Sequence, residues 1–539
     1  MKRKLLILLF VLASLQLAAA CEKTQRPPFL PPPGSSPPVE MIWEVRADYS
    51  NLTPYAPYSM CSRLREGPLP ELIPSPDYGM LLPYASSIVL ADGGIRAVKY
   101  GLVASNGVIV TDLVYDRLDR AYSTYSYTQK PQPAYKLSRD IPGTETDWGS
   151  QSMLAACALD GSWITGFDYS DIIFTEKAIV LMRSYDSYDI DVYDYNGRLI
   201  YNMLDLEWTG KIRKDTWPGS LVYSISEGYG SIQTSDGTYA YINILTGRAT
   251  YTEYTGAFPF LSGRASVAQW DKHGAIPELW GAIGPDFRLN IPVKYVNPIV
   301  FINGRALAET PDGRWHIINI NGETLLSAPD GRHLEQHYDG SGFTLHPEPG
   351  GEMPVFYTID LVEIPVPDEA RNAGYMTSLY QLGDGWFYCS AADGAVLFTL
   401  FEKHFIPGAG HIIFFDGEYV VYSWNSRSGN GVGVIALDGR EIVPSEPNIM
   451  ITAVAEEGAA KAFVVNKGPS MYAFTVGPYI HSGYRLVGLD GDIIRSGPGV
   501  LTYDEAAGLY SVLDADNYIW LDKDGNIIIN IPVMSYTMD

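Results

Sequence analysis

The sequence predicts an all-β protein built from repeated hairpins, and three observations support this prediction. Short runs rich in β-branched and aromatic residues alternate with Gly, Asn, Asp and Pro, and sustained helical periodicity is scarce. Tyrosine, which favours strands, occurs 38 times in 539 residues. An aromatic residue followed seven positions later by glycine recurs along the chain. We therefore expect β-units that stack against one another.

The repeated unit is typical of a β-hairpin. Its best copies occupy residues 315–322, 484–491 and 518–525, and each ends in Asn-Gly or Asp-Gly. That dipeptide predicts a two-residue type I′ turn, because Asn or Asp tolerates positive φ at the first position and Gly at the second. Position 287, seven residues after Trp280, holds Phe in place of the glycine. The residues that define the repeat are Tyr100, Gly107, Trp280, Gly281, Trp315, Gly322, Gly439, Gly491 and Gly525, together with Tyr484 and Tyr518.

The series of hairpins resembles the WG-repeat proteins of bacteria. Residues 258–326 match best, because Trp280-Gly281-Ala-Ile283 is a literal Trp-Gly motif, and the near forms at 100–103 and 432–435 extend the resemblance over most of 80–531. The resemblance implies a β-repeat architecture in a secreted or lipid-anchored protein. It brings no shared catalytic residues.

A β-propeller of about seven or eight blades is the expected architecture, because a four-stranded blade takes about 40–45 residues and radial closure protects the strand edges. At repeated positions, the aromatic residues are expected to pack between blades. An open solenoid of hairpins, or two smaller β domains that meet near the proline-rich stretch 347–367, is the alternative.

The first 20 residues have the anatomy of a secretory signal peptide. Three basic residues precede an apolar run at 5–13, and small residues lead up to Cys21. The apolar run is too short to cross a bilayer, which needs about 20 helical residues. The sequence Ala18-Ala19-Ala20-Cys21 resembles the lipobox of bacterial lipoproteins, which implies a lipid on Cys21 and an extracytoplasmic position at a membrane. Ordinary cleavage that releases a secreted soluble protein is the alternative.

Four segments follow from these patterns. Residues 1–20 are the signal peptide, and 21–40 are the anchor cysteine with a tether that contains seven prolines. Such a tether is extended, and it spans up to about 60 Å at about 3.1 Å per residue. Residues 41–80 form an N-terminal extension, and 81–539 form the β-repeat domain.

Composition excludes several classes of function. The formal charge of −24 and the absence of a Lys/Arg-rich run beyond residues 2–4 exclude nucleic acid as a partner, because binding to phosphates depends on positive charge. Four widely spaced cysteines exclude a disulfide framework. Nucleotide and serine-hydrolase motifs are absent, so no cofactor and no catalytic residue is assigned.

Two polar clusters are candidate metal sites. His333, His337 and His346, with Glu335, form the chain's histidine cluster, but their spacing matches no known metal motif, so they are weak candidates. The run of Asp186, Asp189, Asp191 and Asp194 fails the EF-hand pattern, and a solvated strand face that ends in a hairpin explains it better. The segment 234–239 resembles the Asp-box of sialidases only loosely.

These observations predict a lipid-anchored extracytoplasmic β-repeat protein that binds another protein or a cell-envelope polymer and catalyses nothing. The alternative from a different class is a propeller hydrolase that acts on envelope glycans, since the 62 acidic residues include enough carboxylates to form a catalytic pair.

Overall fold

The computed structural model describes residues 72–537, apart from 90–94, 124–130, 142, 145–150, 214–215, 270–278, 338–339, 348–353, 369–378, 384–385, 392, 427–428, 457, 468–482, 506 and 534. The expected signal peptide and tether, Cys21 and most of the expected N-terminal extension lie outside the described residues. The chain divides into two compact units, residues 1–51 and 52–539, and all described residues belong to the second. None of their helices is long and apolar enough to cross a membrane.

The described residues form eleven β-sheets, and every strand pairing is antiparallel except one. The first half of the chain contributes β1 (Leu81–Val89), β2 (Ile95–Ala104), β3 (Arg117–Tyr122), β4 (Pro131–Asp140), β5 (Ser152–Ala158), β6 (Asp171–Phe174), β7 (Ile179–Met182), β8 (Ile190–Tyr193), β9 (Leu199–Asn202), β10 (Tyr229–Gln233), β11 (Tyr239–Asn243), β12 (Ala249–Tyr251), β13 (Gly256–Leu261), β14 (Arg264–Gln269), β15 (Leu279–Ile283) and β16 (Leu289–Tyr295).

The second half contributes β17 (Arg305–Glu309), β18 (Trp315–Asn319), β19 (Thr324–Ser327), β20 (Leu334–Gln336), β21 (Gly342–Leu345), β22 (Val355–Thr358), β23 (Glu363–Ile364), β24 (Tyr380–Gly383), β25 (Trp386–Ala391), β26 (Gly394–Phe398), β27 (Lys403–Pro407), β28 (His411–Phe415), β29 (Tyr419–Ser426), β30 (Gly429–Ala436), β31 (Glu441–Pro447), β32 (Ile449–Glu456), β33 (Ala459–Lys467), β34 (Gly483–Gly488), β35 (Ile493–Gly497), β36 (Val500–Asp504), β37 (Leu509–Leu513), β38 (Asn517–Leu521), β39 (Ile527–Pro532) and β40 (Ser535–Thr537). Short helices are η2 (Pro76–Tyr78), η3 (Met203–Asp205), η4 (Glu207–Lys211) and α3 (Pro218–Val222).

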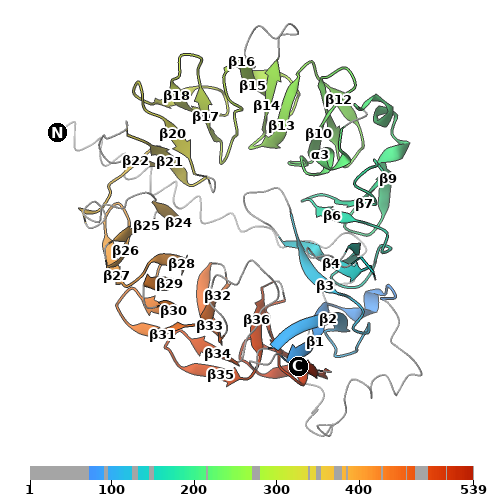
Figure 1. Cartoon of the computed structure of the whole chain (residues 1–539), viewed down its shortest axis with the longest axis vertical. Coiled ribbons are helices and arrows are strands. Elements are labelled where there is room, and N and C mark those ends of the chain that lie inside the picture. The colour runs from blue at the N-terminus through green and yellow to red at the C-terminus, as the bar shows by residue number, and fades with distance from the viewer. Residues whose placement is uncertain are drawn as a thin grey trace, which may run out of the picture. The chain divides into compact units, whose positions relative to one another are not determined.

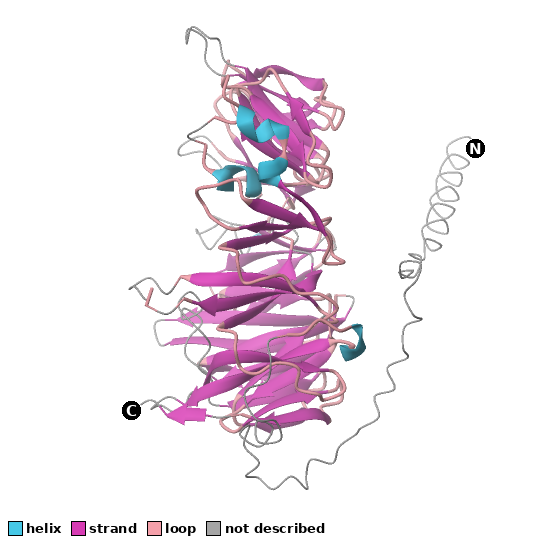
Figure 2. Cartoon of the chain, turned by 90° about the vertical axis from the view of Figure 1, so that its right-hand side faces the viewer, coloured by secondary structure: helices cyan, strands magenta, loops and turns pink. Residues whose placement is uncertain are grey.

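The sheets are the blades of a β-propeller, which confirms the expected architecture (Figure 1). Ten sheets consist of consecutive strands, and the remaining sheet, in the order β2-β1-β40, joins the two ends of the repeat region. In Figure 2 the strands of neighbouring blades run side by side across the thickness of the ring. The blades follow one another without a break, and the stretch 347–367 supplies strands β22 and β23 of one blade.

The expected number of seven or eight blades is wrong. The structure has ten blades of consecutive strands in addition to the closing sheet. The expectation assumed about 40–45 residues per blade, whereas the four strands β36–β39 take only residues 500–532. Tight turns, and three-stranded sheets such as β10-β11-β12 and β17-β18-β19, bring the length of a blade below the usual value.

The core is divided among the seams between neighbouring sheets. Eleven clusters of buried apolar residues are present in the described residues, and each joins one sheet to the next. Where the ring closes, Leu82 and Tyr84 of β1 pack with Trp520 and Ile529 of the last blade. The Trp520 indole N–H also donates to the Pro83 carbonyl (3.0 Å). Closure is therefore a packed seam like the others.

The repeat turns have the expected glycine but a different turn type. In the first best copy, Gly322 has φ 78° while Asn321 keeps a negative φ, so the expected type I′ turn is wrong. Gly322 N–H donates to Asn319 O (2.9 Å), and Asn319 N–H donates to Glu323 O (3.1 Å). This is a type I turn followed by a glycine bulge. The Asn319 side chain stabilises this turn, because it accepts from the N–H groups of Asn321 (2.9 Å) and Glu323 (3.1 Å).

The copy that lacks the glycine keeps the same backbone. Phe287 takes φ 61°, and its N–H donates to Gly284 O (2.9 Å), as the glycine does elsewhere. A bulky residue in this conformation is strained. The Phe287 ring packs against Tyr229, Tyr241 and Phe260, so burial of the ring offsets the strain.

The aromatic residues at the start of the hairpin copies pack between blades, as the repeat pattern predicts, and two of them also line cavities. Trp280 and Tyr484 are buried, and Tyr518 and Trp315 pack against the edges of core clusters. Trp315 and Tyr484 also line surface cavities. Trp315 is half-buried, so part of its ring faces its cavity, whereas Tyr484 is almost fully buried.

Substitution of Asn466 tests how much one seam contributes. The buried Asn466 amide donates to Leu501 O (2.8 Å) and accepts from Leu501 N–H (2.9 Å), which clamps β33 to β36 of the next blade. We expect Asn466→Ala to lower the free energy of unfolding by roughly 2–4 kcal/mol. The change leaves the buried N–H and C=O of Leu501 without these partners, and each unsatisfied buried polar group costs about 1–3 kcal/mol. Urea unfolding measures this. Asn526→Ala, at an exposed hairpin, is the control, and equal midpoints for the two variants would contradict the clamp.

Candidate functional site

The repeat is interrupted between β9 and β10. In place of a short turn, residues 203–228 form a connection that contains η3, η4 and α3. Helix α3 contacts β10, and its Leu221 and Val222 belong to the core cluster between the β6–β9 and β10–β12 blades. Ser224, just after α3, bonds through its hydroxyl to both Ser231 N–H (2.8 Å) and Ser231 O (3.0 Å) of β10. Helix α3 thus occupies the position that an innermost strand has in a four-stranded blade.

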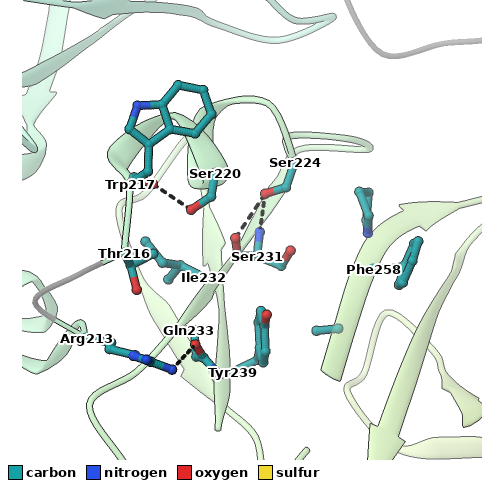
Figure 3. Close-up of a pocket in the computed structure, with 12 residues that line it drawn as sticks. Arg213, Thr216, Trp217, Ser220, Ser224, Ser231, Ile232, Gln233, Tyr239 and Phe258 are labelled. Atoms are coloured by element: carbon teal, nitrogen blue, oxygen red, sulfur yellow. Dashed lines mark hydrogen bonds between the residues drawn. The ribbon is translucent and has the colours of Figure 1, made fainter. Parts of the chain in front are cut away.

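A cavity of about 480 Å³ opens beside this connection, and we call it the α3 cavity. Figure 3 shows its lining side chains, which come from the connection, from β10 and β11, and from β13 of the next blade. Its volume lies within the range of about 300–1,000 Å³ that small-ligand sites usually have. The lining residues are Arg213, Thr216, Trp217, Ser220, Ser224, Ser231, Ile232, Gln233, Tyr239, Ala257, Phe258 and Pro259.

Exposed aromatic rings stand at this cavity. The Trp217 side chain is 48% exposed, and its ring stacks with Tyr185 (centroids 6.4 Å apart, 19° between planes) and with Tyr223 (5.5 Å, 31°). Phe258 is 37% exposed and packs edge-on against Trp280 (5.4 Å). Partly exposed aromatic rings at a cavity are typical of a ligand contact surface.

Hydrogen bonds fix this aromatic group to the neighbouring blade. The Tyr223 hydroxyl donates to Asp171 of β6, and Lys136 pairs with the same carboxylate (3.2 Å). Burial, followed by the Asp171 acceptor, raises the pKa of Tyr223 above its ordinary value, so the phenol stays protonated at neutral pH. The ring that supports Trp217 is therefore a fixed, uncharged donor.

The polar lining offers both donors and acceptors. Arg213 Nη1 donates to the Gln233 side-chain oxygen (3.2 Å), and the Gln233 amide nitrogen donates to Gly237 O (3.3 Å). The hydroxyls of Thr216, Ser220 and Ser231 stand nearby. None of the twelve lining residues is Asp or Glu, so the hydrolase alternative gains no support from this cavity.

A tight turn between β10 and β11 positions Gln233 and Tyr239. Asp236 accepts hydrogen bonds from the Thr234 hydroxyl (2.6 Å), the Thr238 hydroxyl (2.8 Å) and Thr238 N–H (3.0 Å). These donors, Thr234 foremost, lower the pKa of Asp236 to about 2. The segment that resembles an Asp-box in sequence is thus a turn that holds two lining residues.

The acidic run lies in the β6–β9 blade beside this connection, and it is not the solvated strand face that the sequence suggested. Asp191 is buried and pairs with Arg183 (2.5 Å), while Tyr169 donates to it (2.8 Å). The Asn202 amide donates to both Asp189 (2.7 Å) and Asp191 (2.8 Å). Protein donors therefore satisfy these two carboxylates.

Two further cavities lie at the equivalent ends of other blades. One, of about 370 Å³, is lined by Trp315 and His333, and another, of about 410 Å³, is lined by Tyr484 and Arg485. Trp315 begins β18 and Tyr484 lies at the start of β34, and Tyr239 of the α3 cavity likewise begins β11. All three strands precede the repeat hairpin of their blade, so the three cavities open on the same face of the ring.

The histidine cluster is only partly brought together. The rings of His333 and His346 stack (4.3 Å, 6°), and His346 Nε2 lies 2.7 Å from Glu335. His337 is directed elsewhere, since its ring nitrogens bond to hydroxyls of Ser341 (3.0 Å) and Thr344 (2.9 Å). In the described part of the chain, no group of three or more His, Cys, Asp or Glu residues could hold a metal ion.

Arg213, Trp217 and Phe258 escaped the sequence analysis. Arg213 and Trp217 lie outside the hairpin copies, whereas Phe258 begins the best-matching repeat, 258–326, in which aromatic residues are expected to pack between blades. The available signal was the interruption itself, because the stretch between the turn glycines 197 and 247 contains Trp208 and Trp217 but no copy of the hairpin motif in its middle.

Comparison with known proteins adds little. No protein-family profile matches the sequence, and no curated protein matches it. Solved structures with some similarity include a eukaryotic initiation factor (11% identity, 68% of this chain and 96% of that chain, TM-score 0.34) and the computationally designed Ika8 protein (14%, 66% and 93%, 0.22). BamB from Moraxella catarrhalis is a third (12%, 66% and 94%, 0.21). Scores this low carry no argument about function.

The Thr234–Asp236 contact predicts a specific pH response. Because the folded pKa lies below the ordinary value of 3.8, the ionised carboxylate stabilises the turn above about pH 4, and this stabilisation disappears as pH falls toward about 2. Thr234→Val removes the main donor and should raise the pKa of Asp236 toward 3.8. NMR titration with labelled aspartate measures it.

Thr310→Val is the matched control, because Thr310 bonds to Asp312 in the same way in another blade (2.5 Å). It should leave Asp236 unchanged. An Asp236 carboxyl that titrates identically in Thr234→Val and in the unsubstituted protein would refute the assignment.

Proposed function

We propose that the protein is a non-catalytic binding or scaffold protein of the bacterial cell envelope, a WG-repeat lipoprotein held at the extracytoplasmic surface by a lipid on Cys21. It binds another protein or an envelope polymer through the face of the ring on which the three cavities open. Residues 21–40 act as the stand-off tether between the membrane and the propeller.

The observation that carries this proposal is the α3 cavity. Here helix α3 lies against β10 of a three-stranded blade, and Trp217 is 48% exposed at a cavity of small-ligand size. An interruption of the repeat that exposes a large aromatic side chain beside a cavity has the features of a recognition site.

The anchor is tested by cell fractionation. We expect the unsubstituted protein to remain with membranes and Cys21→Ala to appear in the soluble extracytoplasmic fraction or the medium, because the change removes the only acyl acceptor that the lipobox resemblance supplies. Cys389→Ala is the control, since that thiol is buried in a blade. Recovery of Cys21→Ala wholly with membranes would contradict the anchor.

The binding function is tested by cross-linking in cells followed by mass spectrometry. We expect at least one reproducible neighbour, cross-linked through lysines of the cavity face such as Lys467, which lines the Tyr484 cavity. The neighbour should be lost or weakened in Trp217→Ala but kept in Tyr251→Ala, a similarly exposed aromatic residue of the β10–β12 blade that does not line the cavity. Cross-links that persist unchanged in Trp217→Ala would place the binding surface elsewhere.

A further inference from the structure

The chemistry of the α3 cavity specifies a class of ligand. Trp217 lies over the start of α3, where a side chain at position 219 would overlap its ring, so Gly219 is what allows this placement. Tyr185 and Tyr223 stack with the same indole, and Phe258 stands on the adjoining blade. The result is a set of rigid, half-exposed aromatic rings that can cover an apolar ring face at little entropic cost.

The polar groups around these rings suit a ligand that both donates and accepts hydrogen bonds. Arg213 can only donate, while the Gln233 amide and the Thr216 hydroxyl can do both. The Ser220 hydroxyl already donates to Trp217 O (2.7 Å) and can still accept. A sugar ring presents an apolar face of C–H groups and a rim of hydroxyls, each of which can donate and accept a hydrogen bond. A run of prolines, such as residues 31–33 of the chain's own tether, has carbonyl acceptors but no N–H donors, so it would leave part of this lining unpaired.

Charge argues for a neutral ligand. One guanidinium lines the cavity, and it is already bonded to Gln233. Asp171 lies behind Tyr223 and is paired with Lys136, and the whole chain carries a formal charge of −24. An anionic polymer would be repelled by this field before it reached the cavity.

We propose that the α3 cavity binds a neutral segment of a polysaccharide, with the apolar face of one sugar unit against Trp217 and hydroxyls of a neighbouring unit bonded to Arg213 and Gln233. This inference rests on the proposed binding function and names the ligand class of that site.

The test is isothermal titration calorimetry of the purified full-length chain. The probes are neutral hexasaccharides of glucose, mannose, xylose and N-acetylglucosamine, an oligogalacturonate as the anionic probe, and a synthetic peptide of residues 26–40. We expect binding of at least one neutral hexasaccharide and none of the oligogalacturonate. Trp217→Ala should weaken that binding by roughly tenfold or more, because central aromatic contacts carry most of the energy of such sites.

Three further variants separate loss of contact from loss of fold. Trp217→Phe keeps an aromatic face and should retain most of the affinity, whereas Gly219→Ala keeps the indole but displaces it and should weaken binding. Tyr251→Ala should bind like the unsubstituted protein. Near-ultraviolet circular dichroism confirms that each variant is folded.

The proposal is overturned if no neutral hexasaccharide binds, if binding is unchanged in Trp217→Ala, or if only the 26–40 peptide binds in a manner that depends on Trp217. A protein neighbour that still requires Trp217 in cells, combined with no sugar binding, would remove this inference and leave the proposed binding function standing.

Discussion

Every blade of this propeller is stable because it buries its two faces against the blades on either side. A three- or four-stranded antiparallel sheet has no covered face of its own, and each apolar side chain moved from water into a seam contributes about 1.5–3 kcal/mol. The apolar clusters of the described residues lie at such seams. Side-chain hydrogen bonds, such as that from Trp520 to Pro83 O, fix how the two sheets are oriented against each other. A binding site can therefore arise only where the seam between two blades remains filled with apolar side chains.

At the α3 cavity, residues of the connection between β9 and β10 keep the seam filled. Leu221, Val222 and Ile225 keep the seam between two blades filled, although no strand is present there. A helical turn points side chains in more directions than a strand does, so Trp217 at its start can face solvent while its neighbours remain in the core. The site is compatible with the fold because α3 still buries apolar side chains on the side that faces the seam. Its other side is free to present Trp217 to solvent.

Part of this structure follows from the sequence, and part does not. The strand content and the hairpin positions follow from Trp315, Tyr484 and the glycines seven residues later, because turn glycines must adopt positive φ. The turn type differs from the prediction because Asn or Asp before the glycine keeps a negative φ in these hairpins, and in two of the three best copies the side chain of Asn319 or Asp522, three positions before the glycine, caps the loop.

The blade number and the site depend on long-range packing. Blade number cannot be read from spacing when sheets differ in strand count, and the helix that replaces a strand has no repeat signature. The α3 cavity joins Trp217 to Phe258 of the next blade only after the two blades stack. The buried Asp191, which reads as a surface charge in a polar run, is likewise explained only by Arg183, which the fold places beside it.

The pairing of β1 with β40 has a consequence for how the chain reaches its final state. These strands run parallel, with Ser87 opposite Ser535 and Val89 opposite Thr537, across almost the whole length of the repeat region. Contacts between residues so distant in sequence carry a high loop-closure cost and form late in folding. Until β40 has been synthesised, one edge of β1 stays without its native partner, and an open edge can pair with other chains. A chain truncated before β40 would therefore retain the strands of its ten blades but expose the edge of β1 that β40 covers in the complete ring.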